Sequence, residues 1–161
     1  MIDANLIFDG TAPNTGAAIT VTRVSGNVID LLANRDVGAA GYLEIIVGVL
    51  TTFTAGGAAT LQIAMQGGND STAAANYDLL FSPTYALSAL TAGKQLFRAK
   101  MPMYQENEVG GIGKPGRYLN LKYTVTTGPF TAGAVFAYLA GADDRDIQQS
   151  YQYPANYAIT A

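Results

Sequence analysis

The stretch RYLNLKYTVTTGPFTAGAVFAYLA, residues 117–140, decides the fold class. In its first half apolar side chains alternate with polar ones, so that Leu119, Leu121 and Tyr123 share one face of an extended chain. A period of two is typical of a β-strand with one buried face. Turn-forming residues at 127–131 interrupt the alternation, which then resumes to the end of the stretch. We therefore expect two antiparallel strands joined as a hairpin.

The second half of this stretch is apolar on both faces. Alternate positions hold Ala134, Phe136 and Tyr138 on one side and Val135, Ala137 and Leu139 on the other. A strand of this kind needs packing partners on both of its faces. The pattern predicts a sheet that is covered on both sides.

Several other segments have strand character, and they lie at 27–31, 42–49, 59–66, 76–88 and 94–101. We expect 42–49 and 59–66 to form a second hairpin around a turn at 51–57. Pro83 favours a sheet edge for the segment that contains it. Seven or eight short strands without a long helical period predict an all-β fold, an antiparallel jelly roll or β-sandwich.

An internal repeat links the two expected hairpins. The sequence Phe-Thr-Ala-Gly at 53–56 recurs at 130–133, each time between two strand-like segments. Equivalent units about half a chain apart fit a jelly roll, which consists of two Greek-key sets. The alternative is that turns rich in Thr, Ala and Gly resemble one another by chance.

Composition limits the classes of partner. The chain has 161 residues, which suits one domain, and a formal net charge of −3 without a basic stripe, which argues against nucleic acid as a direct partner. Charged residues make up only 13%, about half the usual share, and such a surface suits a protein that binds a partner. The alternative is a β protein that is simply rich in Thr, Gly and Ala.

Membrane insertion and secretion are not expected either. The longest apolar run, 43–50, contains Glu44 and is far shorter than the roughly 20 residues of a membrane-spanning helix. The opening MIDANLIFDG carries acidic residues where a secretory signal has positive charge.

Catalytic and metal-binding residues are scarce. The chain has no His and no Cys, which excludes Ser-His-Asp and Cys-His nucleophiles and ordinary zinc sites. Glu106 with Glu108, and the acidic run at 143–146, are more simply read as solvated charges than as a glycosidase pair or a calcium site. Segment 109–115 resembles a phosphate loop, but Pro115 replaces the hydroxyl residue and a strand follows instead of a helix. We expect no enzyme activity, no metal and no cofactor.

The last 21 residues, 141–161, depart from the strand pattern and are expected to form a C-terminal tail beside a single domain at 1–140. Tyrosines and isoleucines recur in the tail among Gln, Asn and Ala. Tyr gives a large contact area at low side-chain entropy cost, which suits an interface. The candidate partner-interface residues are Ile147, Tyr151, Tyr153, Tyr157 and Ile159. The alternative is that the tail packs back on its own domain.

Three sequence features together resemble a known family. They are the opening MIDANLIFDG, the segment NVIDLLANRDVGAAGYLEIIVGV at 27–49, and the paired units TTFTAGGAATLQ and YLNLKYTVTTGPFTAGAVFAYL; Tyr153-Pro154 in the tail adds to them. The chain resembles the capsid cement, or decoration, proteins of tailed phages typified by the Bordetella phage head. The resemblance implies a jelly roll on the outside of an icosahedral shell, which bridges neighbouring major capsid subunits, commonly as a homodimer. It implies no catalytic residue.

These observations predict a structural virion protein, located on the capsid exterior, with the major capsid protein shell and itself as partners. A carbohydrate-binding jelly-roll module is the alternative from a different class, because the same fold serves lectins. Another structural protein of the virion, for example of the tail, is a third interpretation.

Overall fold

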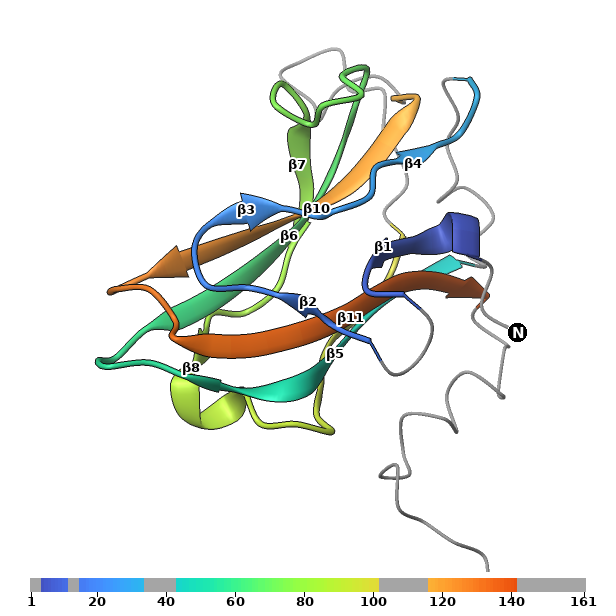
Figure 1. Ribbon diagram of the computed structural model, residues 1–161. Helices are drawn as coiled ribbons and strands as arrows, with labels where there is room; N and C mark the ends of the chain where they lie inside the picture. Colours follow the sequence, from blue (N-terminus) through green and yellow to red (C-terminus); the bar gives the residue numbers. More distant parts are fainter. Residues whose placement is uncertain (1–3, 12–14, 34–42, 102–115, 142–161) are drawn as a thin grey trace, which may run out of the picture.

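Two antiparallel β-sheets pack face to face in this protein (Figure 1). The computed structural model describes residues 4–11, 15–33, 43–101 and 116–141. The first sheet has the order β1 (Ile7–Asp9), β11 (Ala132–Gly141), β5 (Leu43–Thr54) and β9 (Gln95–Lys100), with β2 (Ala17–Ala18) paired to β11. The second has the order β3 (Arg23–Val24), β10 (Tyr118–Thr126), β6 (Thr60–Gly68) and β7 (Tyr77–Phe81). In this sheet β4 (Ile29–Asp30) pairs with β10 and β8 (Tyr85–Ala86) pairs with β6.

The helical elements of the described residues are two short 3₁₀ turns, η1 (Ala4–Leu6) and η2 (Leu87–Ala89). The prediction of an all-β sandwich is therefore confirmed. No helix in the described part of the chain is long and apolar enough to span a membrane.

The hydrophobic core lies between the two sheets. The structure confirms the inward-facing residues that the sequence alternation predicts. Leu119, Leu121 and Tyr123 of β10 are fully buried. The inward-facing residues of the other central strands are equally buried, and they include Ile45, Val47, Val49, Leu61, Ile63, Met65, Val135, Ala137 and Leu139.

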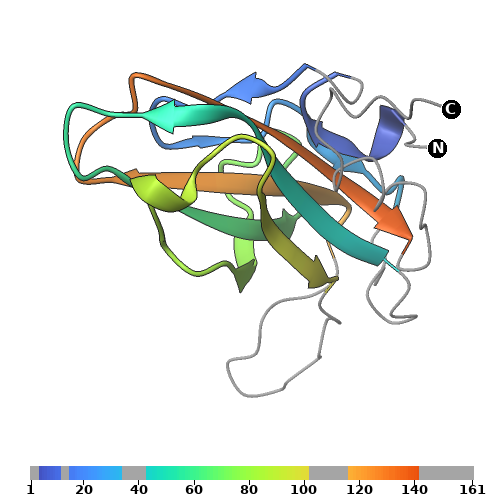
Figure 2. The same cartoon turned by 90° about the horizontal axis from the view of Figure 1, so that it is seen from below.

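Both predicted hairpins are wrong. β10 belongs to the second sheet and β11 to the first, so the turn between them crosses from one sheet to the other (Figure 2). The turn between β5 and β6 does the same. We call each such unit, two strands in opposite sheets joined by a short turn, an arch. The side-chain alternation of a strand is the same whether the next strand lies beside it in the same sheet or opposite it in the facing sheet. Both arrangements bury one face of each strand.

The two arches pair with each other along their whole length. β5 is hydrogen-bonded to β11, and β6 to β10, so each sheet holds one strand of each arch. β5 extends to Thr54, and the predicted turn at 51–57 therefore begins too early. The repeated sequences at 53–56 and 130–133 lie side by side where the arches turn.

The outer face of the first sheet carries a second apolar cluster. Phe136 and Tyr138 of β11 are fully buried on this face, and Ile46 of β5 is nearly so. Gly10, in the left-handed region at φ +91°, runs so close to Phe136 that a Cβ at this position would lie 2.5 Å from the ring. The prediction that β11 packs on both of its faces is confirmed.

The edge strands of the two sheets agree in part with the sequence prediction. β7 and β9 are edge strands, as Pro83 favours for the segment containing β7. The short strands β2 and β3 were not predicted, because two residues are too few to show a period.

Candidate contact surfaces

One end of the sandwich is formed by the two arch turns and the neighbouring residues 20–22, and we call it the arch end. It lies on the left of Figures 1 and 2, opposite the end at which β11 finishes. The rings of Phe53 and Phe130 meet edge to face beneath its surface, with centroids 4.9 Å apart and planes at 73°. Both rings are buried, so the repeated Phe of each arch supports the other.

Threonine hydroxyls join the arches above these rings. Thr54 Oγ1 lies 2.7 Å from Thr131 Oγ1, and Thr60 Oγ1 lies 2.6 Å from Thr126 Oγ1. The Thr131 amide also donates to the Thr54 carbonyl at 2.7 Å. The arch end is therefore ordered by neutral hydrogen bonds between exposed residues.

A third segment is attached to this end. Thr22 Oγ1 donates to the Val125 carbonyl at 3.2 Å and accepts from the Val125 amide at 2.9 Å, and the Phe130 amide donates to the Thr20 carbonyl at 2.9 Å. Val21 stands between them with 55% of its surface exposed.

The opposite end, where β11 finishes at Gly141 and β4 meets β10, is the tail end, and it contains charge. Arg117 donates two hydrogen bonds to the Asp30 carboxylate, from Nε at 2.6 Å and from Nη2 at 2.7 Å. This side-chain hydrogen bonding is the main reason that the pKa of Asp30 is lowered below its ordinary value and the pKa of Arg117 is raised. Asp30 Oδ1 also accepts from the Leu32 amide at 2.8 Å. Leu32 is held at φ +64° with 76% of its surface exposed.

A polar network covers the outer face of the second sheet near this end. Asn120 of β10 is fully buried, donates to Gln66 Oε1 at 2.8 Å, and accepts from Asn76 Nδ2 at 2.9 Å. Gln66 in turn donates to Asp78 Oδ1 at 2.7 Å. Because the loop holding Asn76 folds back over the sheet, a residue on the face expected to be polar is buried. Sequence alternation alone gives no signal of such a cover.

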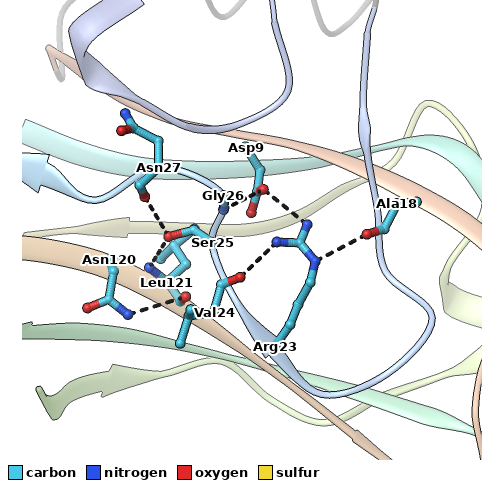
Figure 3. A network of polar contacts seen from close by, with 9 residues as sticks. All are labelled: Asp9, Ala18, Arg23, Val24, Ser25, Gly26, Asn27, Asn120 and Leu121. Carbon is cyan, nitrogen blue, oxygen red and sulfur yellow. Dashed lines mark hydrogen bonds and ion pairs between the residues drawn. The ribbon is translucent and has the colours of Figure 1, made fainter. Parts of the chain in front are cut away.

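A buried ion pair ties the first strand to the second sheet (Figure 3). Arg23 Nη2 of β3 lies 3.0 Å from Asp9 Oδ1 of β1, and the Asp9 side chain is only 1% exposed. The same carboxylate oxygen accepts from the Gly26 amide at 2.9 Å. The Arg23 guanidinium lies over the Tyr123 ring, 5.1 Å from its centroid. Burial, followed by the charge of Asp9, raises the pKa of Tyr123 well above its ordinary value.

Ser25 extends this network to β10. Its hydroxyl donates to the Asn27 carbonyl at 2.8 Å and accepts from the Leu121 amide at 3.0 Å, and the Asn27 side chain donates to the Ile7 carbonyl at 2.7 Å. On the opposite edge of the sandwich the Tyr85 hydroxyl of β8 donates to the Leu96 carbonyl of β9. These contacts connect the sheets at both edges, and they hold the fold together.

The five carboxylates in the described residues all take part in such local contacts. Asp9, Asp30 and Glu44 pair with arginines, Asp78 accepts from Gln66, and Asp70 accepts from Thr72 and Ala75 within its own loop. In the described part of the chain, no group of three or more His, Cys, Asp or Glu side chains is placed to hold a metal ion.

The interface residues predicted in the tail, Ile147, Tyr151, Tyr153, Tyr157 and Ile159, lie outside the described residues. So do Glu106, Glu108, the acidic run at 143–146 and the glycine-rich segment at 109–115. The last strand of the described residues, β11, ends at Gly141, at the tail end. Whether these residues form an interface stays a prediction.

Comparison with known proteins gives one family. The family model described as Bbp16 matches residues 14–139, which is most of the chain and includes both arches. A search of curated proteins finds no match.

Proposed function

We propose that this chain, which belongs to the Bbp16 family of Bordetella phage proteins, is a capsid cement protein. In this role it binds the outside of an icosahedral phage head and bridges neighbouring major capsid subunits. The single observation that carries the proposal is the family match over residues 14–139.

The shape of the domain supports a bridging role. β11 alone has ten residues and connects the arch end to the tail end, a length of about 33 Å in an extended strand. Two ends this far apart can contact different subunits of a shell. Each contact on its own can be weak, because two contacts within one rigid body reinforce each other.

The jelly-roll description of the fold is part of the same proposal. β1 pairs with the last strand, β11, and β3 pairs with β10, so the first part of the chain lies beside its last part. β5 and β6 follow next in their respective sheets, with β9 and β7 at the far edges. Two sheets wound in this manner are what a jelly roll of two Greek keys requires.

Cement proteins stabilise a shell by mass action. A protein that binds assembled subunits but not free ones shifts the equilibrium toward the assembled shell, in proportion to its occupancy. This chain would act without catalysis or cofactor, as a homodimer on the capsid exterior.

The proposal is tested with phage heads that lack this protein. Purified full-length protein is added to them, and binding is measured by co-sedimentation together with the temperature at which the heads break open. We expect saturable binding at a fixed ratio to capsid subunits and a higher breaking temperature. Free capsid subunits are the control and should not bind. Failure to co-sediment with heads, together with binding to an array of glycans, would favour the carbohydrate-binding alternative.

A further inference from the structure

The arch end differs from the rest of the molecule in having no charge. The described segments that form it, residues 20–22, 54–60 and 126–132, contain no Asp, Glu, Lys or Arg. Threonine is the main exposed residue there, and Val21 adds an exposed apolar side chain. Charged residues are depleted at the centres of protein interfaces, and a surface without charge has little long-range attraction for an ionic partner.

The arch end is also preorganised. The Thr54–Thr131 and Thr60–Thr126 hydroxyl pairs fix the two turns, and the buried Phe53–Phe130 contact supports them from below. A surface that is already ordered loses little conformational entropy on binding.

Thr127 at the tip adds an independent observation. It is exposed and has φ +64°, in the left-handed region that β-branched residues rarely adopt. Such a backbone costs about 1–3 kcal/mol, and Gly or Asn would adopt it more readily. Residues held in sparsely populated backbone regions cluster at functional sites.

We propose that the arch end is a contact surface for the uncharged protein surface of the assembled shell, with Thr127 and Val21 at its centre. This inference rests on the proposed cement function and adds to it which end of the sandwich binds and by what chemistry. The tail end would then supply the second contact of the bridge. The opposite positions of the two ends on one rigid sandwich are what bridging between subunits requires.

The test compares two exposed positions in the full-length protein. Thr127→Asp introduces a charge at the tip with a residue that tolerates positive φ, and Thr127→Asn has the same shape without the charge. Phe81→Asp is the matched control, because Phe81 lies on edge strand β7, away from the arch end, with 54% of its surface exposed. Circular dichroism and thermal melting confirm that each variant folds.

We expect Thr127→Asp to weaken binding to heads at least about tenfold, because it buries an unpaired charge, and Thr127→Asn to weaken it at most about threefold. Phe81→Asp should bind as the native chain does.

Two results would overturn the inference. The first is that Thr127→Asp binds heads as tightly as the native chain, whether or not it disrupts self-association, which analytical ultracentrifugation measures. The second is that Phe81→Asp is the variant that loses binding. The native chain separates the two failures. If it binds heads and the variants do not behave as expected, only the inference about the arch end fails; if it does not bind heads, the proposed function fails.

Discussion

The arch end and the tail end of this sandwich are held by different forces. At the arch end the contacts are buried aromatic rings, close backbone approach and neutral hydroxyl pairs. At the tail end they are the exposed Asp30–Arg117 pair and a polar network around Asn120. The arch end should therefore depend on shape, and the tail end on pH and salt. The four predictions below test this difference, from the largest effect to the smallest.

Within the arch end, the two repeated glycines should behave differently. A Cβ on Gly133, at φ +141°, would lie 2.3 Å from the Phe53 ring, whereas one on Gly56 would meet nothing within 4 Å. We expect Gly133→Ala to lower the free energy of unfolding by about 3 kcal/mol, because it overpacks a buried contact and strains the backbone. Gly56→Ala should change it by less than about 0.5 kcal/mol. Urea unfolding measures both, and equal effects would contradict the role given to shape.

Between the two ends, the buried Asp9–Arg23 ion pair should contribute more to the free energy of unfolding than the Glu44–Arg98 ion pair on the outer face. The Asp9 side chain is 1% exposed and Arg23 is 25% exposed, against 12% and 36% for Glu44 and Arg98. We expect Asp9→Ala to cost about 2 kcal/mol, because it leaves a partly buried guanidinium without its partner. Glu44→Ala should cost less than about 1 kcal/mol. The two losses are compared by chemical unfolding, and a larger loss for Glu44→Ala would refute this ranking.

Relief of the strain at Thr127 should stabilise the arch end. Gly adopts φ +64° without steric cost, although it also gives the unfolded chain more freedom. We expect Thr127→Gly to raise the free energy of unfolding by up to about 1 kcal/mol. The melting temperature should rise while binding to phage heads weakens. A lower melting temperature would mean that the Thr side chain serves the fold instead.

Acid should weaken the tail end before the arch end. Arg117 lowers the pKa of Asp30 below its ordinary 3.8. As pH falls, the unfolded chain takes up a proton first, so the stability from this pair is complete above pH 3.8 and is lost as pH falls from there to the lower folded pKa. The stability advantage over Asp30→Asn should disappear across that window and also shrink in about 1 M salt. An advantage that does not vary with pH would contradict the assignment.

Much of the fold was predictable from alternation alone. The inward residues of β5, β6 and β10 and the two-sided packing of β11 follow from a period of two, because burial selects side chains one by one along a strand. The repeat at 53–56 and 130–133 correctly indicated two equivalent units. Alternation does not say whether consecutive strands lie in one sheet or two, so it does not distinguish an arch from a hairpin.

The contact surfaces were less predictable. The sequence indicated a partner through its low charge, but only the fold brings residues 20–22, 54 and 131 to one end, far apart as they are along the chain. The burial of Asn120 depends on a loop that folds back over the sheet, and the Asp9–Arg23 pair depends on how two short strands meet. These are tertiary contacts, without a local signal in the sequence. The role of the tail residues from Ile147 to Ile159 as a partner interface stays a prediction.

The most direct test of the central claim is a cryo-electron microscopy reconstruction of phage heads that carry this protein, at a resolution sufficient to place the two sheets. We predict density for the sandwich on the outside of the shell, with the arch end and the tail end in contact with different capsid subunits. A head without this density on its exterior, or one in which a single end makes every contact with a single subunit, would contradict the account.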